Sequence, residues 1–180
     1  PNGVTEILDE AFSSCPSLSV VNIPDTVKRI GEGAFEGCDK LERVVLPEGL
    51  MTIGDGAFRS CTSLESITIP ASVELLGESV FNYCSNLNSV YCKSVTPPAI
   101  EGSYPLFGVD GYDVSTPKDV VIYVPTESVE QYKSAEGWSE YAELYVEEGS
   151  EDTGNQGGTS NPGGNTGNQG GSDGTDTASV

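Results

Sequence analysis

The sequence predicts a repeat solenoid, a coil of stacked rungs whose short strands form one short parallel β-sheet. Two observations support this fold class. The chain repeats with a period of 23 residues, without a gap, over residues 1–92. Each 23-residue block also holds too few apolar side chains to enclose a core by itself, so neighbouring blocks must stack to bury a continuous one.

The four blocks span residues 1–23, 24–46, 47–69 and 70–92. Four columns of the aligned blocks hold a single residue type each: proline, phenylalanine, cysteine or leucine. These columns are Pro1, Pro24, Pro47 and Pro70; Phe12, Phe35, Phe58 and Phe81; Cys15, Cys38, Cys61 and Cys84; and Leu18, Leu41, Leu64 and Leu87. Because the same side chain recurs in every block, the columns predict ladders through the interior of the stack.

Within a block, alternating apolar residues predict the strand. In Leu18-x-x-Val21-x-Ile23, Val21 and Ile23 are expected to face the core and Asn22 the solvent. The proline that follows ends the strand, because it has no N–H for a further ladder hydrogen bond. The remaining residues are few and rich in glycine, so we expect short helical or irregular return segments.

The period changes after Cys92. Two periods from Pro70 fall well short of Pro125, and an insertion of nine positions is needed to align the two prolines. Residues 93–124 are therefore predicted to be a degenerate fifth repeat with a loop, and Val120–Val124 to be the last strand.

Residues 125–146 are predicted to cap the stack. A short helix is expected over Glu127–Ala135, starting at Thr126 or Ser128. The apolar side chains after it would cover the open end, because an uncovered rung exposes both core and strand edge. These side chains are Trp138, Tyr141, Leu144 and Tyr145. The first block has no comparable cap, so we expect that the chain is part of a longer protein and that a signal peptide could lie upstream.

The solenoid with its cap thus spans residues 1–146. Residues 147–180 consist almost entirely of Gly, Asn, Gln, Ser, Thr and Asp. Such a segment buries too little surface to offset chain entropy, so we expect a disordered linker.

The repeat pattern resembles the BspA-like leucine-rich repeat family of bacterial cell-surface proteins. The residues that carry the resemblance are Leu41, Val44, Leu46, Pro47, Ile53, Gly54, Ala57, Phe58 and Cys61. The resemblance implies the leucine-rich-repeat form of solenoid, a right-handed coil. It also implies a secreted or cell-surface location in a bacterium and attachment to host proteins, matrix proteins or other cells.

Charge and composition exclude several function classes. The 8 basic and 28 acidic residues give a net charge of −20, which argues against binding to nucleic acid or to anionic lipid. The chain has no histidine, which excludes Ser-His-Asp and Cys-His catalysis and histidine zinc sites. The longest apolar run, Val120–Val124, is too short to span a bilayer, and no signal segment opens the chain.

The five cysteines have three interpretations. We expect buried free thiols, because parallel side chains in a ladder do not point at each other as a disulfide requires. A disulfide between adjacent rungs is the second interpretation. A metal-binding or catalytic role is the third, and it lacks a histidine to activate a thiolate.

One column is acidic and consists of Asp9, Glu32, Asp55 and Glu78. We expect these carboxylates at the start of short turns, where negative charge meets free N–H groups. The alternative is a row of calcium ligands, although calcium sites usually gather several kinds of ligand around one point.

The outward-facing strand positions form a candidate binding face. It consists of Asn22, Arg43, Val45, Ser66, Thr68, Ser89, Tyr91 and Tyr123. If Val120–Val124 pairs beside Ser89–Cys92, Tyr91 and Tyr123 lie side by side. Paired tyrosines offer flat contact area of low conformational entropy, but exposed tyrosines are also ordinary strand formers.

These observations predict a non-enzymatic module that binds a host or matrix protein. No catalytic, cofactor or metal residues are assigned, and no cofactor is expected. A structural spacer that displays another domain is the alternative. A carbohydrate-binding or carbohydrate-active module is less favoured, because no acid stands apart from the repeat columns. The sequence leaves the ligand and the oligomeric state open.

Overall fold

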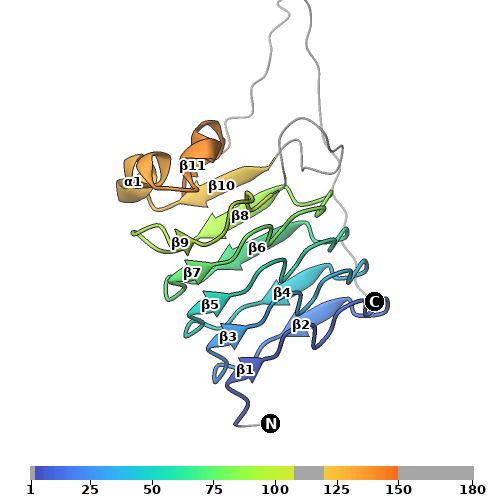
Figure 1. The fold of residues 1–180 in the computed structure, drawn as a ribbon. Helices are drawn as coiled ribbons and strands as arrows, with labels where there is room; N and C mark the ends of the chain where they lie inside the picture. The colour runs from blue at the N-terminus through green and yellow to red at the C-terminus, as the bar shows by residue number, and fades with distance from the viewer. Residues whose placement is uncertain (1–2, 108–119, 150–180) are drawn as a thin grey trace, which may run out of the picture. The chain divides into compact units, whose positions relative to one another are not determined.

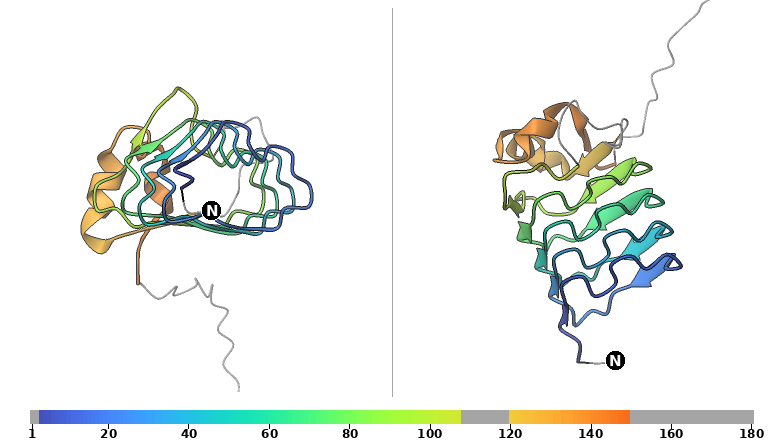
Figure 2. Two further views of the ribbon diagram at one scale, coloured as in Figure 1. Left: turned by 90° about the horizontal axis from the view of Figure 1, so that it is seen from below. Right: turned by 45° about the vertical axis from the view of Figure 1, so that its right-hand side comes forward.

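Short parallel strands stack at an offset of one repeat in the computed structural model, which describes residues 3–107 and 120–149 (Figure 1). The strands in chain order are β1 (Glu6–Ile7), β2 (Val20–Asn22), β3 (Arg29–Ile30), β4 (Arg43–Val45), β5 (Thr52–Ile53), β6 (Ser66–Ile69), β7 (Leu75–Leu76), β8 (Ser89–Cys92), β9 (Ala99–Ile100), β10 (Val121–Val124) and β11 (Tyr145–Glu147). Ile7 pairs with Ile30, and Val21 pairs with Val44, so the members of both pairs are one sequence period apart. The period is therefore the register between rungs, and successive rungs overlie one another when viewed along the stack (Figure 2).

We call the side of the solenoid that carries the predicted strands the front face. It comprises the pair β2–β4 and, next to it in Figure 1, the four-stranded sheet β6–β8–β10–β11. In β6, Ile67 and Ile69 are buried, whereas Ser66 and Thr68 are exposed. This confirms the predicted alternation.

The expectation of one sheet is wrong, because the return segments form a second parallel ladder, β1–β3–β5–β7–β9. Each of its strands is two residues long. Ile30, Ile53 and Leu76 face inward from it and are fully buried. Two residues are too few to show alternation in the sequence. The sequence of each return segment therefore looks irregular, and its strand forms only where rungs stack. The rest of each return segment in rungs one to four is a series of turns.

The phenylalanine column forms a continuous stack through the core. Ring centroids are 5.3 Å apart between Phe12 and Phe35 and between Phe35 and Phe58, and 6.0 Å apart between Phe58 and Phe81. The fifth rung extends the stack with Phe107, 5.8 Å from Phe81. Parallel rungs place each ring over its counterpart, as the column predicted.

The cysteine column forms a second interior ladder, and all five cysteines are free thiols. In rungs two to four, the thiol donates to the carbonyl oxygen of the phenylalanine one rung earlier, as from Cys61 Sγ to Phe35 (3.2 Å) and from Cys84 Sγ to Phe58 (3.1 Å). The prediction of buried free thiols is confirmed for these rungs. The thiols also form hydrogen bonds between rungs, beyond the small apolar role expected of them.

Glycine follows the inward residue of the second ladder because the preceding rung leaves no room for a side chain. A Cβ atom at Gly54 would lie 2.7 Å from Glu32 N and 2.8 Å from the carbonyl carbon of Gly31. Leu8 holds this position in the first rung and is 65% exposed. The column therefore requires glycine only where a preceding rung packs on it.

The fifth rung absorbs the extra residues gradually. Three pairs of equivalent residues in the fourth and fifth rungs show this. Leu76 and Ile100 are one residue more than a period apart, Phe81 and Phe107 are three more, and Val90 and Ile122 are nine more. The final excess of nine confirms the predicted insertion. Residues 108–119, part of the predicted loop, lie outside the described residues.

The cap closes the C-terminal end with the expected aromatic residues. It contains the 3₁₀ helices η1 (Thr126–Ser128) and η2 (Ser139–Leu144) and the helix α1 (Val129–Ser134). Trp138 Nε1 donates to the Pro98 carbonyl (2.7 Å), and the Tyr132 hydroxyl donates to the Ser94 carbonyl (3.0 Å). These bonds connect side chains of the cap to backbone carbonyls of the fifth rung.

The ordered domain continues beyond the predicted boundary at residue 146. β11 pairs with β10 as an additional rung, with Tyr145 opposite Ile122, so Val120–Val124 is not the last strand. The Glu148 N–H donates to the Val124 carbonyl (2.8 Å). Glu147 and Glu148, which we expected to be linker, are therefore part of the last rung. The predicted linker from residue 150 to 180 lies outside the described residues.

The phenylalanine stack predicts a graded response to truncation. Phe58 is fully buried between two ring neighbours, so Phe58→Ala should cost about 3–5 kcal/mol of unfolding free energy. Phe12 is 42% exposed and stacks only on Phe35 among the ring contacts of the described residues, so Phe12→Ala should cost less. Urea denaturation of both variants measures the difference. Equal losses would contradict nearest-neighbour stacking.

The glycine column predicts that replacing one of its glycines by alanine destabilises the protein, which is the opposite of the usual result. Replacing glycine by alanine at an unstrained site usually stabilises a protein by reducing the entropy of the unfolded chain. Gly54→Ala should instead lower stability by about 1–3 kcal/mol, because the new methyl group meets backbone atoms of the preceding rung. Leu8→Ala at the same column position is the matched control and should change stability by less than about 0.5 kcal/mol. A more stable Gly54→Ala variant would refute the steric explanation.

Candidate binding face

The eight residues predicted to form the binding face lie in two outward columns on the front strands. The register pairs Ser66 with Ser89, and Thr68 with Tyr91. In the neighbouring sheet, Asn22 pairs with Val45, and Arg43 lies in the other column of the same strand pair. The structure therefore places the predicted residues on one side of the solenoid, as rows along the stacking direction.

Tyr91 and Tyr123 are the largest side chains in these rows, and the structure brings them together. They are direct register partners on β8 and β10. Their ring centroids are 4.7 Å apart and their planes differ by 11°, which is a stacked arrangement. Both side chains are partly exposed. The predicted side-by-side placement is confirmed.

Three further residues border the tyrosine pair. Lys93 Nζ lies 5.8 Å from the ring centroid of Tyr91 and forms an ion pair with Glu148. Val146 on β11 is the register partner of Tyr123. We call these five residues the tyrosine patch: Tyr91, Lys93, Tyr123, Val146 and Glu148.

The sequence analysis missed the border of the tyrosine patch because it ended the sheet at Val124. One signal was available, since Tyr145 follows its partner Ile122 by one full period. The Lys93–Glu148 contact joins residues far apart in the chain. Both residues occupy one repeat column, two rungs apart with Pro125 between them, but this is apparent only when the rung added by β11 is counted.

The far end of the candidate face is separate from this patch. Asn22 and Tyr123 occupy the first and fifth rungs, roughly 19 Å apart at the spacing of about 4.8 Å between strands. Val45 is 44% exposed, and Ser66 and Thr68 are small and exposed. The front face thus carries small or polar side chains and exposed valines, with one aromatic patch near its capped end.

The acidic column binds backbone N–H groups, but those of the next rung. Asp9 Oδ1 accepts from the Glu32 N–H (2.9 Å), and Asp55 Oδ1 accepts from the Glu78 N–H (3.0 Å). Glu78 Oε2 likewise accepts from the Ser103 N–H, so the expected contacts with N–H groups are present at three of the four positions. The stacking of rungs supplies the N–H group from the following rung.

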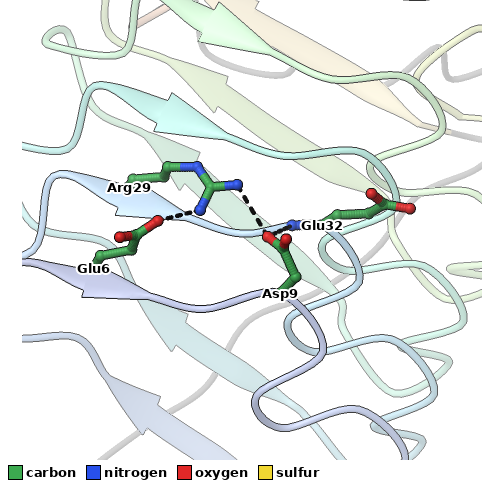
Figure 3. Close-up of polar contacts among 4 residues, drawn as sticks. All are labelled: Glu6, Asp9, Arg29 and Glu32. Atoms are coloured by element: carbon green, nitrogen blue, oxygen red, sulfur yellow. Dashed lines mark hydrogen bonds and ion pairs between the residues drawn. The ribbon is translucent and has the colours of Figure 1, made fainter.

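Arg29 joins two acids of the first rung, as Figure 3 shows. Its guanidinium forms an ion pair with Glu6 and another with Asp9 (2.9 Å). The Glu32 N–H and the Arg29 side chain together hold the pKa of Asp9 below its usual range. The acidic column therefore contributes contacts between rungs. Among the residues that the structure describes, no group of three or more metal-binding side chains is present.

Burial keeps the inner thiols protonated at neutral pH. It raises the pKa of Cys84 and of Cys92 to about 12, and it raises the pKa of Cys61 further still. A thiol of such high pKa carries almost no thiolate, which is the reactive form. Cys61 and Cys84 have a structural role in the cysteine ladder, and Cys92 is a buried residue of β8.

The helices in the described part of the chain are short, and none is long and apolar enough to cross a membrane.

The Asp9 contacts predict a shifted titration. Because both partners favour the charged form, the stabilisation from Asp9 is present above its unfolded pKa. It is lost as the pH falls below that value and through the lower pKa of the folded chain. Arg29→Gln should raise the titration midpoint of Asp9 but leave it below that of an unfolded aspartate, because the bond from the Glu32 N–H is the larger cause.

Carboxyl-carbon NMR titration measures this midpoint, and Arg43→Gln on the front face is the control. An unchanged Asp9 midpoint in Arg29→Gln would show that the ion pair has no effect in solution.

Comparisons with known proteins agree with the geometry. The family model described as BspA type leucine rich repeat region (6 copies) matches residues 3–99. A leucine rich repeat protein of T. pallidum is similar in structure, with a TM-score of 0.56 and 30% identity over 82% of this chain and 64% of that one. No curated protein sequence matches the chain.

Two other solved structures show the same architecture. A leucine rich cell surface protein of Faecalibacterium prausnitzii has a TM-score of 0.51 and 30% identity, over 57% of this chain and 31% of that one. The pneumococcal vaccine antigen PcpA has a TM-score of 0.56 at 22% identity, over 82% of this chain and 38% of that one, and shows the fold alone. The chain thus covers less than two thirds of each of these proteins.

The one-period register, the stacked phenylalanine and cysteine columns and the match over residues 3–99 lead to one conclusion: the chain belongs to the BspA-type leucine-rich repeat family.

Proposed function

We propose that the chain is a non-enzymatic module of a bacterial cell surface, which attaches to a host or matrix protein through the tyrosine patch. The observation that carries this proposal is the stacked pair of Tyr91 and Tyr123, the two aromatic side chains among the outward residues of the front strands. Aromatic side chains lose little conformational entropy on binding, and they are enriched among the residues that dominate interface energies. A stacked pair is also already oriented.

The border of the patch has the features of an interface rim. Lys93 and Glu148 are partly exposed and neutralise each other beside the rings. Interfaces typically surround an aromatic centre with polar groups that remain hydrated. The patch can therefore lose water from its centre without leaving an unpaired charge at its edge.

Residue inventory and family support the non-enzymatic, surface-exposed part of the proposal. The chain has no histidine, and its inner thiols are held protonated by burial. The similar structure from Faecalibacterium prausnitzii is that of a cell-surface protein. We extend that location to this chain as part of the proposal.

A structural spacer is the second candidate function. Small exposed residues such as Ser66 and Thr68 make up much of the front face, and they offer little binding energy to a partner. A stack held by backbone hydrogen bonds along its length would also keep another domain at a defined distance.

The double variant Tyr91→Ser/Tyr123→Ser tests the binding proposal. Both rings are partly exposed and stack on each other outside the core, so the variant should lose about 1–2 kcal/mol of stability and remain folded. Attachment to immobilised basement-membrane matrix should weaken by about 2 kcal/mol or more, which is roughly 30-fold. A thermal melt and a binding isotherm measure the two effects.

Val20→Ser/Val45→Ser is the matched control, because it removes two exposed apolar side chains from the far end of the same face. It should leave attachment unchanged. Wild-type attachment by a folded tyrosine double variant would reject the patch as the binding site and favour the spacer.

A further inference from the structure

A second surface feature lies along the return segments, away from the tyrosine patch. It is a cavity of about 350 Å³. Gly33 and Gly56 lie in it with φ of 55° and 54°, a left-handed backbone conformation that favours glycine. The absence of side chains at these two positions leaves the centre of the cavity open. We call this cavity the acidic groove.

The walls of the acidic groove come from two columns of successive rungs. One wall consists of Glu32, Asp55 and Glu78, and the other consists of Glu36, Arg59 and Asn82. Glu10 lies at the end of the groove nearest the first rung. The lining therefore contains five carboxylates and one guanidinium.

Most of these carboxylates have no cation beside them. The ion pairs of the described residues include Glu36 with Arg59 (3.8 Å), but none involves Glu10, Glu32, Asp55 or Glu78. Asp55 and Glu78 accept backbone hydrogen bonds, which hold their oxygens in place without neutralising their charge. Carboxylates that share a confined surface favour a cationic partner.

Asn82 is an independent sign that the groove has a ligand. It is 9% exposed and lines the groove in the same column as Glu36 and Arg59. Its backbone N–H and carbonyl are paired, with Ser79 and Ser60, but its side-chain amide forms no hydrogen bond to any described residue. Buried amides in native proteins are almost always paired. The Asn82 amide offers a carbonyl acceptor and two donors to a bound molecule.

Arg59 shows which chemistry the groove accepts. Its guanidinium carbon lies 5.2 Å from the ring centroid of Tyr83, and its Nε lies 3.8 Å from Glu36. The groove thus already holds one guanidinium between an aromatic face and a carboxylate. Tyr104 is 55% exposed at the other end and offers a second aromatic face.

The acidic surface continues past Tyr104. This residue also borders a smaller cavity of about 160 Å³, whose lining includes Glu136 and Glu140 of the cap. Glu78 Oε2 accepts from the Ser103 N–H (2.9 Å), which positions the loop that carries Tyr104. A ligand that extends along the groove would therefore reach further carboxylates at the capped end.

We propose that the acidic groove binds an extended segment of a partner protein that carries arginine or lysine side chains. The carboxylates of the groove come from four rungs, from Glu10 to Glu78, and span about 15 Å at the spacing of about 4.8 Å between strands, which is the length of four to five extended residues. Its carboxylates are spread along this length, so a row of cationic side chains fits them better than a single small ion. The proposal concerns a different surface from the tyrosine patch and does not depend on it.

The test uses a defined probe, the peptide acetyl-Arg-Ser-Arg-Ser-Arg-amide, and the folded chain. Isothermal titration calorimetry should detect binding that weakens with salt. The analogue with citrulline in place of arginine keeps the shape but loses the charge, and it should not bind. Equal binding of both peptides would overturn the proposal.

The variant Glu32→Gln/Glu78→Gln removes two of the carboxylates that lack a cation and keeps a side-chain acceptor for Ser103. It should bind the arginine peptide about tenfold more weakly or worse, because hydrogen bonds to charged groups are the stronger ones. Because the whole chain is acidic, the matched control is Glu48→Gln/Glu74→Gln, which makes the same change of charge at exposed positions outside the groove. The control should lose less than about twofold. Equal losses in the two variants would show that binding depends on the net charge of the chain and not on the groove, which would overturn the proposed site.

Arg59 provides a test of opposite sign. Because its guanidinium occupies part of the groove, Arg59→Gln should bind the arginine peptide more tightly than the wild type. In the wild type, the side-chain amide signals of Asn82 in the ¹H–¹⁵N spectrum should shift on peptide addition. Weaker binding by Arg59→Gln, or Asn82 amide signals that stay in place at saturation, would contradict the proposed geometry.

Discussion

The structure depends on one constraint, the parallel hydrogen-bonded register between residues one repeat apart. This register places every side chain over its counterpart in the next rung. Interior columns therefore become stacks of like residues, such as the phenylalanine rings and the cysteine thiols that bond the carbonyls of the previous rung. The same constraint requires glycine at position 54, where the preceding rung leaves no room for Cβ. Local propensity contributes little, because the strands are only two to four residues long.

A stack of this kind must end, and the cap shows how this chain solves the problem. Tyr132 and Trp138 donate to carbonyls of the fifth rung, and the Tyr141 hydroxyl accepts from the Leu106 N–H (2.9 Å). Tyr141 also packs edge-on against Phe107, which terminates the phenylalanine stack. Large amphipathic rings suit this role, because they cover apolar surface and carry a polar group to the exposed backbone.

The register also organises the surface, since an outward column becomes a row of side chains along the solenoid. On the front face, such a row brings two tyrosines into a stacked pair. On the return segments, two neighbouring columns become the opposite walls of a groove. The chain thus has two chemically distinct surfaces, one aromatic with a neutral rim and one acidic. A repeat protein can vary such surfaces independently, because outward residues do not take part in the core ladders.

The sequence by itself determined the period, the interior columns, the front strands, the nine-residue insertion and the adjacency of Tyr91 and Tyr123. All of these follow from reading one repeat register, because equivalent positions of stacked rungs are neighbours. Only the tertiary structure decided the second ladder, the added strand β11, the Lys93–Glu148 pair and the hydrogen bonds of the acidic column. Two-residue strands are too short to show a pattern, and Lys93 and Glu148 share a repeat column, two rungs apart, only when the rung added by β11 is counted. The burial of Asn82 likewise depends on how the residues around it pack, because the columns predict which residues are equivalent and not how much solvent reaches each one.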